Sequence, residues 1–110
     1  MEKFVKGDIV VIPFPFSDLT GAKRRPALVL ADLQGDDIIL CQITSHQTKD
    51  NYSILLEDKD YIFNKLPVLS NIRPNQIFTA DKNIIIKKVA SIKETAFKTV
   101  IQKILDILSS

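Results

Sequence analysis

The sequence has 110 residues, of which 45% are hydrophobic and 25% are charged, and its net charge is +2. This length fits one domain with one core, residues 1–110, and this composition excludes an intrinsically disordered chain. The net charge is too small to mark a nucleic-acid-binding protein, so any such argument depends on where the charges lie.

The only cysteine, Cys41, cannot form an internal disulfide and lies in an apolar run, where a small core residue is expected. A reduced, cytosolic setting fits this composition best. The first residues, MEKFVKGD, hold no apolar stretch long enough for a signal peptide, and no window approaches a membrane span. We therefore expect a cytoplasmic protein.

Six short apolar runs predict β-strands along most of the chain. They are rich in Val, Ile and Leu, and clusters of Asp, Asn, Lys and Pro separate them. The first three strands are expected at 8–13, 26–31 and 37–43. The weaker three are expected at 53–56, 68–72 and 83–89.

The hydrophobic period changes near the end of the sequence, which predicts an amphipathic helix from 93 to 108. Its apolar face is formed by six residues: Phe97, Val100, Ile101, Ile104, Leu105 and Leu108. Ser91 and Glu94 have the spacing of a capping box at the helix start. Short antiparallel strands followed by one such helix predict a mainly β fold, in which the helix closes a small, strongly curved sheet or barrel.

The segment FPFSDLTGAKRRPALVL links the first two predicted strands. Pro15 cannot join a strand ladder and Gly21 adds flexibility, so residues 14–24 are predicted to form a long loop. The loop ends in adjacent cations that a simple connection does not need. The next residue, Arg25, precedes Pro26, and a residue before proline is pushed towards extended conformations that orient its side chain reproducibly.

A tight turn around Gly35 is predicted to join the second and third strands into a hairpin. Counting outward from this turn places Arg25 opposite Ile43 or Thr44. The register is uncertain by one residue, so the sequence leaves open whether Arg25 and Thr44 share a face. The open end of the hairpin groups a cation with polar residues: Arg25, Thr44, Ser45 and His46.

This group has the chemistry of a phosphate site. An arginine offers a planar fork of donors to phosphate oxygens, and serine and threonine hydroxyls add rotatable hydrogen bonds. The alternative is an arginine that covers the sheet edge beside a strand-ending threonine, because charged residues gather at strand ends for solubility. Residue spacing alone leaves both readings open.

Three motifs in this order resemble the MazF/PemK family, the toxins of bacterial toxin-antitoxin systems: KGDIV, KRRPALVL and ITS. The resemblance covers nearly the whole chain and is most specific from Gly7 to Ser45. It implies a small SH3-like antiparallel barrel, also similar to CcdB, that is usually a homodimer. It also implies metal-independent endoribonuclease cleavage of single-stranded mRNA, often at short sequence motifs, and neutralisation by a cognate antitoxin. The family's active-site pair, the Arg before the strand-opening Pro and the Thr that ends the third strand, corresponds to Arg25 and Thr44.

The implied reaction needs no metal or cofactor, because the RNA supplies its own 2′-hydroxyl nucleophile. An arginine is a poor general base, since its pKa stays above about 12. We therefore assign Arg25 chiefly to clamping the phosphate and stabilising the phosphorane, although the family's arginine is also given an acid or base role. Thr44 is assigned to orient a phosphate oxygen or the attacking hydroxyl.

Further RNA contacts are expected around this pair from five residues: Lys23, Arg24, Ser45, His46 and Arg73. His46 is the only histidine and can be read either as a base or as an incidental loop residue. Arg73 repeats the Arg-Pro arrangement at a later strand end, with a surface role as its alternative.

The loop before these cations is expected to gate the site, through Phe14, Phe16, Ser17, Asp18, Thr20 and Gly21. It can close over RNA or receive an acidic, apolar segment of the antitoxin, and its alternative is a fixed loop packed on the barrel by its two phenylalanines. The acidic cluster formed by Glu57, Asp58 and Asp60 is read as a solvated loop and not as a metal site.

Two rival functions remain open from the sequence. A CcdB-like toxin inhibits DNA gyrase by protein contact, but the essential Trp near its C-terminus has no counterpart, since this chain has no Trp. A noncatalytic RNA-binding barrel is the second rival.

Overall fold

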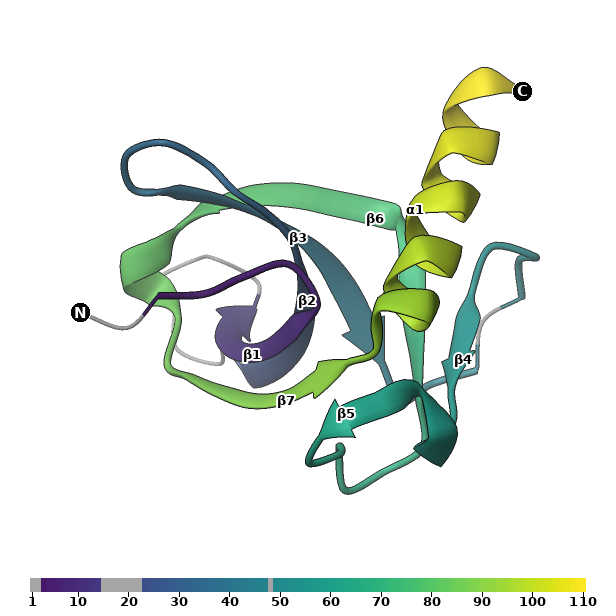
Figure 1. Ribbon diagram of the computed structural model, residues 1–110, viewed down its shortest axis with the longest axis horizontal. Helices are drawn as coiled ribbons and strands as arrows, with labels where there is room; N and C mark the ends of the chain where they lie inside the picture. Colours follow the sequence, from purple (N-terminus) through teal and green to yellow (C-terminus); the bar gives the residue numbers. More distant parts are fainter. Residues whose placement is uncertain (1–2, 15–22, 48) are drawn as a thin grey trace.

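The computed structural model describes residues 3–14, 23–47 and 49–110 (Figure 1). Seven strands form one antiparallel sheet: β1 (Asp8–Phe14), β2 (Lys23–Asp32), β3 (Asp37–Thr44), β4 (Ile54–Leu56), β5 (Tyr61–Phe63), β6 (Ser70–Asp81) and β7 (Lys87–Ile92). Their order in the sheet is β4-β6-β3-β2-β1-β7-β5, and the sheet curves into a nearly closed barrel with α1 (Glu94–Ser109) beside it (Figure 1). The predicted mainly β barrel with a C-terminal helix is confirmed.

The first three predicted strands are confirmed, and β2 begins three residues before its predicted start. The later strands differ more. The strand expected at 68–72 continues to Asp81 because Pro74 lies where the pairing of β6 with β3 shifts register, so its missing N–H costs no ladder bond there. The strand expected at 83–89 begins only at Lys87, since Asp81 accepts a hydrogen bond from the Asn83 N–H (2.8 Å) and starts a 3₁₀ turn, η2 (Lys82–Ile84).

Alternation along the strands divides the core into two clusters on the two faces of the sheet. Along β2, Leu28 belongs to one cluster, whereas Ala27 and Val29 belong to the other. The cluster of Leu28 also receives Val100, which is fully buried in α1. Cys41 is buried in the same cluster, as the sequence predicts, and burial raises the pKa of its thiol to about 12.

The predicted capping box at the start of the helix is wrong. Ser91 lies within β7, which continues to Ile92, whose N–H donates to the Gly7 carbonyl (2.9 Å). The helix therefore starts at Glu94 with Lys93 as its N-cap, and no side chain caps it. Within the described residues, no helix is long and apolar enough to cross a membrane.

The KGD motif fixes the entrance to the barrel. Gly7 has a φ of +96°, which favours glycine, and its turn leads into the buried Asp8. The Asp8 carboxylate accepts a hydrogen bond from the Val5 N–H (3.0 Å) and pairs with Lys88 Nζ of β7 (3.3 Å). One carboxylate thus ties the first turn to β7.

Candidate active site

The hairpin of β2 and β3 has an observed register that reaches as far as Ala27 and Gln42. Gly35 has a φ of +76° in the turn, and Ala27 pairs with Gln42. Continuing this register to the ends of both strands places Arg25 opposite Thr44. Residues directly opposite each other share a face, with their Cβ atoms typically about 5 Å apart. The observed pairing of β2 with β3 ends at Ala27 and Gln42, so the juxtaposition of Arg25 and Thr44 stays a prediction.

A cavity of about 510 Å³ lies at this end of the hairpin. Its wall includes parts of four chain segments: Arg24, Arg25 and Pro26 of β2, Ser45 after β3, residues 65–68 before β6, and Lys87 of β7. Thr44 is not part of this wall, and alternation puts its side chain and that of Arg25 on the face opposite to Pro26. Arg25 contributes to the wall and Thr44 does not, so the cavity includes only one member of the predicted pair.

Arg25 is half-buried, and neither Arg25 nor Arg24 is in an ion pair among the described residues. By contrast, other cations of the described residues are already paired with a carboxylate, such as Arg73 with Asp50. These two guanidinium groups can accept an anion without first losing a partner. The wall of the cavity is therefore suited to phosphate.

Two lysines that the sequence analysis missed, Lys65 and Lys87, join the same wall. Lys87 pairs with Val11 of β1, and Val11 pairs with Pro26 of β2, so one strand, β1, separates Lys87 from the arginines. Lys65 arrives from the connection between β5 and β6 and makes an exposed ion pair with Asp58 (3.4 Å). Both lysines lie far from Arg25 in the sequence, so only the folded structure shows that they reach the same cavity.

The Thr44 hydroxyl oxygen accepts a hydrogen bond from the His46 backbone N–H (3.1 Å). This contact turns the chain at the end of β3 and leaves the hydroxyl proton free to be donated elsewhere. Ser45 and His46 are both exposed beyond the turn. Lys23, a predicted RNA contact, is exposed at the start of β2. Of the predicted gating residues, Phe14 is the last residue of β1, and the others lie within 15–22, outside the described residues.

Arg73 has a different setting from the one expected for an RNA contact. Its Nη2 donates to Asp50 Oδ2 (2.8 Å), and it is not part of the cavity wall. Asp50 also accepts the Tyr52 N–H (3.0 Å), and that hydrogen bond, together with Arg73, holds the pKa of the Asp50 carboxyl below its usual value. The Arg73–Asp50 pair thus ties the connection after His46 to β6.

We expect Asp50→Ala to increase amide hydrogen exchange at Tyr52 about tenfold, the scale of one lost hydrogen bond to a charged group. Asp50→Asn keeps an acceptor for the Tyr52 N–H but removes the charge that holds Arg73, so a smaller increase is expected. Because the pKa of Asp50 is lowered in the folded state, its stabilisation is present at neutral pH and is lost as the pH falls through that lowered pKa. Asp106→Asn on α1 is the matched control, and equal exchange in all variants would contradict this role.

The acidic cluster of the sequence forms a turn. The Glu57 N–H donates to the Asp60 carboxylate (2.8 Å) at the start of the 3₁₀ turn η1 (Asp58–Asp60), and both Asp58 and Glu57 are exposed. Among the described residues, no group of three or more His, Cys, Asp and Glu side chains is arranged to hold a metal ion. The Asp60 carboxylate therefore stabilises this turn.

Comparison with solved structures places this arrangement in a known fold. MazF from Deinococcus radiodurans superposes with a TM-score of 0.77 at 19% identity, covering 100% of both chains. In the MazE–MazF complex from the same organism the TM-score is 0.76 at 20% identity, covering 98% of this chain and 97% of the other. A mycobacterial endoribonuclease in complex with its cognate antitoxin gives 0.76 at 10% identity, covering 97% and 96%. At these identities the similarity establishes the fold.

Sequence comparison supplies the family. A search of curated proteins found no match. Residues 5–108 match the family described as PemK-like, MazF-like toxin of type II toxin-antitoxin system, which spans nearly the whole chain and includes β1 to α1. The chain therefore belongs to the PemK-like, MazF-like toxin family of type II toxin-antitoxin systems.

Proposed function

We propose that this chain is a metal-independent endoribonuclease that cleaves single-stranded mRNA in the cytoplasm, as a homodimer, until a cognate antitoxin neutralises it. The observation that supports the proposal is the cavity lined by Arg24, Arg25 and Ser45, and the β2–β3 register, if continued beyond Ala27 and Gln42, sets Thr44 opposite Arg25. The endoribonuclease and antitoxin named for the similar mycobacterial complex support the same activity and the same class of partner.

The cavity suits a single-stranded RNA backbone. Four cations contribute to its wall: Arg24, Arg25, Lys65 and Lys87. The partly exposed Val11 and Val89 add an apolar part of the wall on which an unpaired base can rest. A duplex is a poorer fit, because its bases are already stacked and its outer surface is polar.

The chemistry follows from the positions of the two central side chains. The 2′-hydroxyl gives up its proton as its oxygen attacks the neighbouring phosphorus, and the bond to the 5′-oxygen breaks. The 5′-oxygen takes up a proton, so a 2′,3′-cyclic phosphate and a 5′-hydroxyl are formed. The Arg25 guanidinium faces the charge that develops on the phosphorane, where preorganised donors contribute most. The Thr44 hydroxyl, whose oxygen is oriented by the His46 N–H, donates to a phosphate oxygen or positions the attacking hydroxyl.

Digestion of a defined, end-labelled RNA with all metal chelated tests this function. Cleavage is expected to persist, to yield 5′-hydroxyl ends, and to stop when a single 2′-deoxy nucleotide replaces the nucleotide at the cut site. Loss of cleavage on chelation would point to a metal-dependent reaction. RNA binding without cleavage would favour the noncatalytic barrel, and inhibition of gyrase without RNA binding would favour the CcdB-like function.

A further inference from the structure

The connection between β5 and β6, residues 64–69, links the two edges of the sheet. β5 is one edge strand, and β6 lies next to β4, which is the other edge strand (Figure 1). Asn64 begins the connection in a left-handed conformation, with a φ of +51°, which asparagine tolerates better than most residues. Residues 65–68 then line both the active-site cavity and a second hollow of about 230 Å³. The connection is therefore a wall that the two hollows share.

The charges on this shared wall are divided between the two hollows. The active-site cavity is lined by four cations and, within the described part of the chain, by no carboxylate. Arg24, Arg25 and Lys87 take part in no ion pair among the described residues. The fourth cation, Lys65, pairs with Asp58 (3.4 Å), and Asp58 lines the second hollow and not the cavity. One carboxylate thus reaches a cation of the active-site wall from outside that wall.

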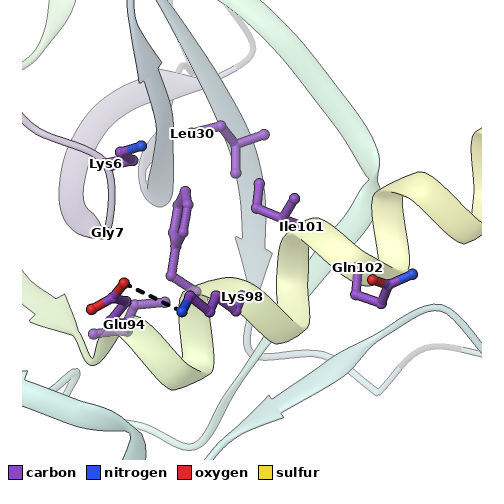
Figure 2. Close-up of a pocket in the computed structure, with 9 residues that line it drawn as sticks. Lys6, Gly7, Leu30, Glu94, Lys98, Ile101 and Gln102 are labelled. Atoms are coloured by element: carbon purple, nitrogen blue, oxygen red, sulfur yellow. Dashed lines mark ion pairs between the residues drawn. The ribbon is translucent and has the colours of Figure 1, made fainter.

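A hollow of about 800 Å³ beside α1 has a different arrangement of charge. There Glu94 pairs with Lys98 (3.5 Å), and both side chains line the same hollow (Figure 2). A ligand in that hollow meets these two charges together, so they largely cancel. A ligand in the active-site cavity meets Lys65 in a wall that Asp58 does not join. An anion in the cavity can therefore take Lys65 from its carboxylate.

The Lys65–Asp58 pair costs little to open. The two side chains are 60% and 84% exposed, and exposed ion pairs contribute little to stability because water and salt screen them. The Asp58 carboxylate makes no other hydrogen bond among the described residues, since the η1 turn is held by Glu57 and Asp60. The flexible stem of lysine lets its ammonium group change partner while the backbone stays in place.

We propose that Lys65 binds a phosphate of the RNA strand beside the reacting one, and that Asp58 competes with the RNA for Lys65. This inference rests on the proposed function for the identity of the ligand. Arg25 is assigned to the reacting phosphate, so Lys65, which enters the wall from another segment, is left for a neighbouring phosphate. Asp58 then lowers the affinity for RNA without contacting it, and thereby sets how strongly the site holds a strand.

A double-mutant cycle on RNA binding tests this competition. The probe is a fluorescent single-stranded RNA of mixed sequence with a 2′-O-methyl group on every ribose, which the proposed reaction cannot cleave. Phosphate contacts carry no sequence information, so one probe serves all variants. Asp58→Asn is expected to tighten binding about twofold to fivefold, the scale of one exposed ion pair. In a Lys65→Ala chain the same change is expected to have almost no effect, because no cation is left to release.

The salt dependence of binding gives a second readout, which a purely structural role of Lys65 would not change. Removal of Lys65 from the Asp58→Asn chain is expected to weaken binding. It is also expected to reduce the slope of log affinity against log salt concentration by about 0.7, the value of one phosphate contact to a single strand. Affinities are compared at about 0.15 M salt, where charges more than about 8 Å apart are largely screened.

Lys59 and Glu57 provide matched controls. They form an exposed ion pair beside the same turn (3.7 Å), and neither lines the active-site cavity. Glu57→Gln changes the net charge as much as Asp58→Asn does and keeps a side-chain acceptor for the turn. Glu57→Gln and Lys59→Ala are both expected to leave RNA affinity unchanged, and thermal unfolding checks that every variant folds.

Three results would overturn the proposal: equal tightening by Asp58→Asn with and without Lys65, equal tightening by Glu57→Gln, or no binding of the probe. The first two would assign the effect to net charge alone. Cleavage of unmodified RNA by the wild-type chain tests the proposed nuclease separately. A chain that shows the coupling between Asp58 and Lys65 but cleaves no RNA would contradict the nuclease and support the competition. A chain that cleaves RNA without this coupling would do the reverse.

Discussion

Replacement of Arg25 by alanine is expected to slow RNA cleavage by roughly 100-fold or more, as does the loss of a single preorganised donor to developing charge in other enzymes. Arg25 lines the cavity, and in the proposed reaction its guanidinium meets the reacting phosphate. It takes part in no ion pair among the described residues, so its removal leaves no buried carboxylate unpaired. The fold is therefore expected to persist, and thermal unfolding measures this.

Two companion variants separate catalysis from charge. Arg25→Lys keeps the positive charge but loses the planar fork, so only partial recovery of the rate is expected. Arg24→Ala removes a neighbouring cation of the same wall, and we expect it to weaken RNA binding and reduce the salt dependence of binding with little change in the rate of the bound complex. A folded Arg25→Ala chain that cleaves at the wild-type rate would remove Arg25 from the chemistry.

Local sequence signals were sufficient for the parts of the fold that local physics decides. The apolar runs at β1, β2 and β3 have strand length, and Gly35 supplies the backbone conformation of the turn between β2 and β3. The register of the hairpin shifts between Val29 and Ala31, so the turn alone does not fix it, and the observed pairs end at Ala27 and Gln42. The hairpin itself could be predicted because it is local, whereas the pairing of Arg25 with Thr44 stays a prediction.

The features that the sequence concealed depend on distant partners. β5 has only three residues and is held in the sheet by its pairing with β7. Pro74 indicated the end of a strand, but β6 continues past it because its pairing with β3 shifts register there. Lys87 reaches the active-site cavity only because β7 pairs with β1 and β1 pairs with β2. No local pattern around these residues carries that information.

Arg73 shows how a repeated motif can have a second use. The Arg-Pro pair at Arg73 and Pro74 copies the pair at Arg25 and Pro26 in the sequence. The copy at Arg73 is compensated by Asp50, whereas Arg25 has no such partner among the described residues. An acidic partner distant in the sequence thus decides which of the two arginines is available to phosphate. The RNA contact expected from Arg73 stays a prediction.

Replacement of Thr44 by alanine is expected to lower the cleavage rate of bound RNA by roughly 10-fold to 100-fold, because one donor to the reacting group is lost. RNA affinity is expected to change by less than about threefold, since phosphate contacts from several cations supply most of it. The cations of the cavity wall remain in this variant, and Thr44 itself is not part of that wall. Single-turnover cleavage and equilibrium binding, measured on the same RNA, give the two quantities.

The Thr44 hydroxyl also accepts the His46 N–H, so a purely structural role has to be separated from a role in the reaction. If Thr44 only ends β3, alanine should loosen the turn at His46 and reduce the affinity for RNA as much as the rate. If its hydroxyl acts on the phosphate, the rate alone should fall, and Thr44→Ser should restore it because serine keeps both the acceptor and the donor. Equal losses of rate and affinity in Thr44→Ala would assign the hydroxyl to the turn and leave Arg25 as the central group of the site.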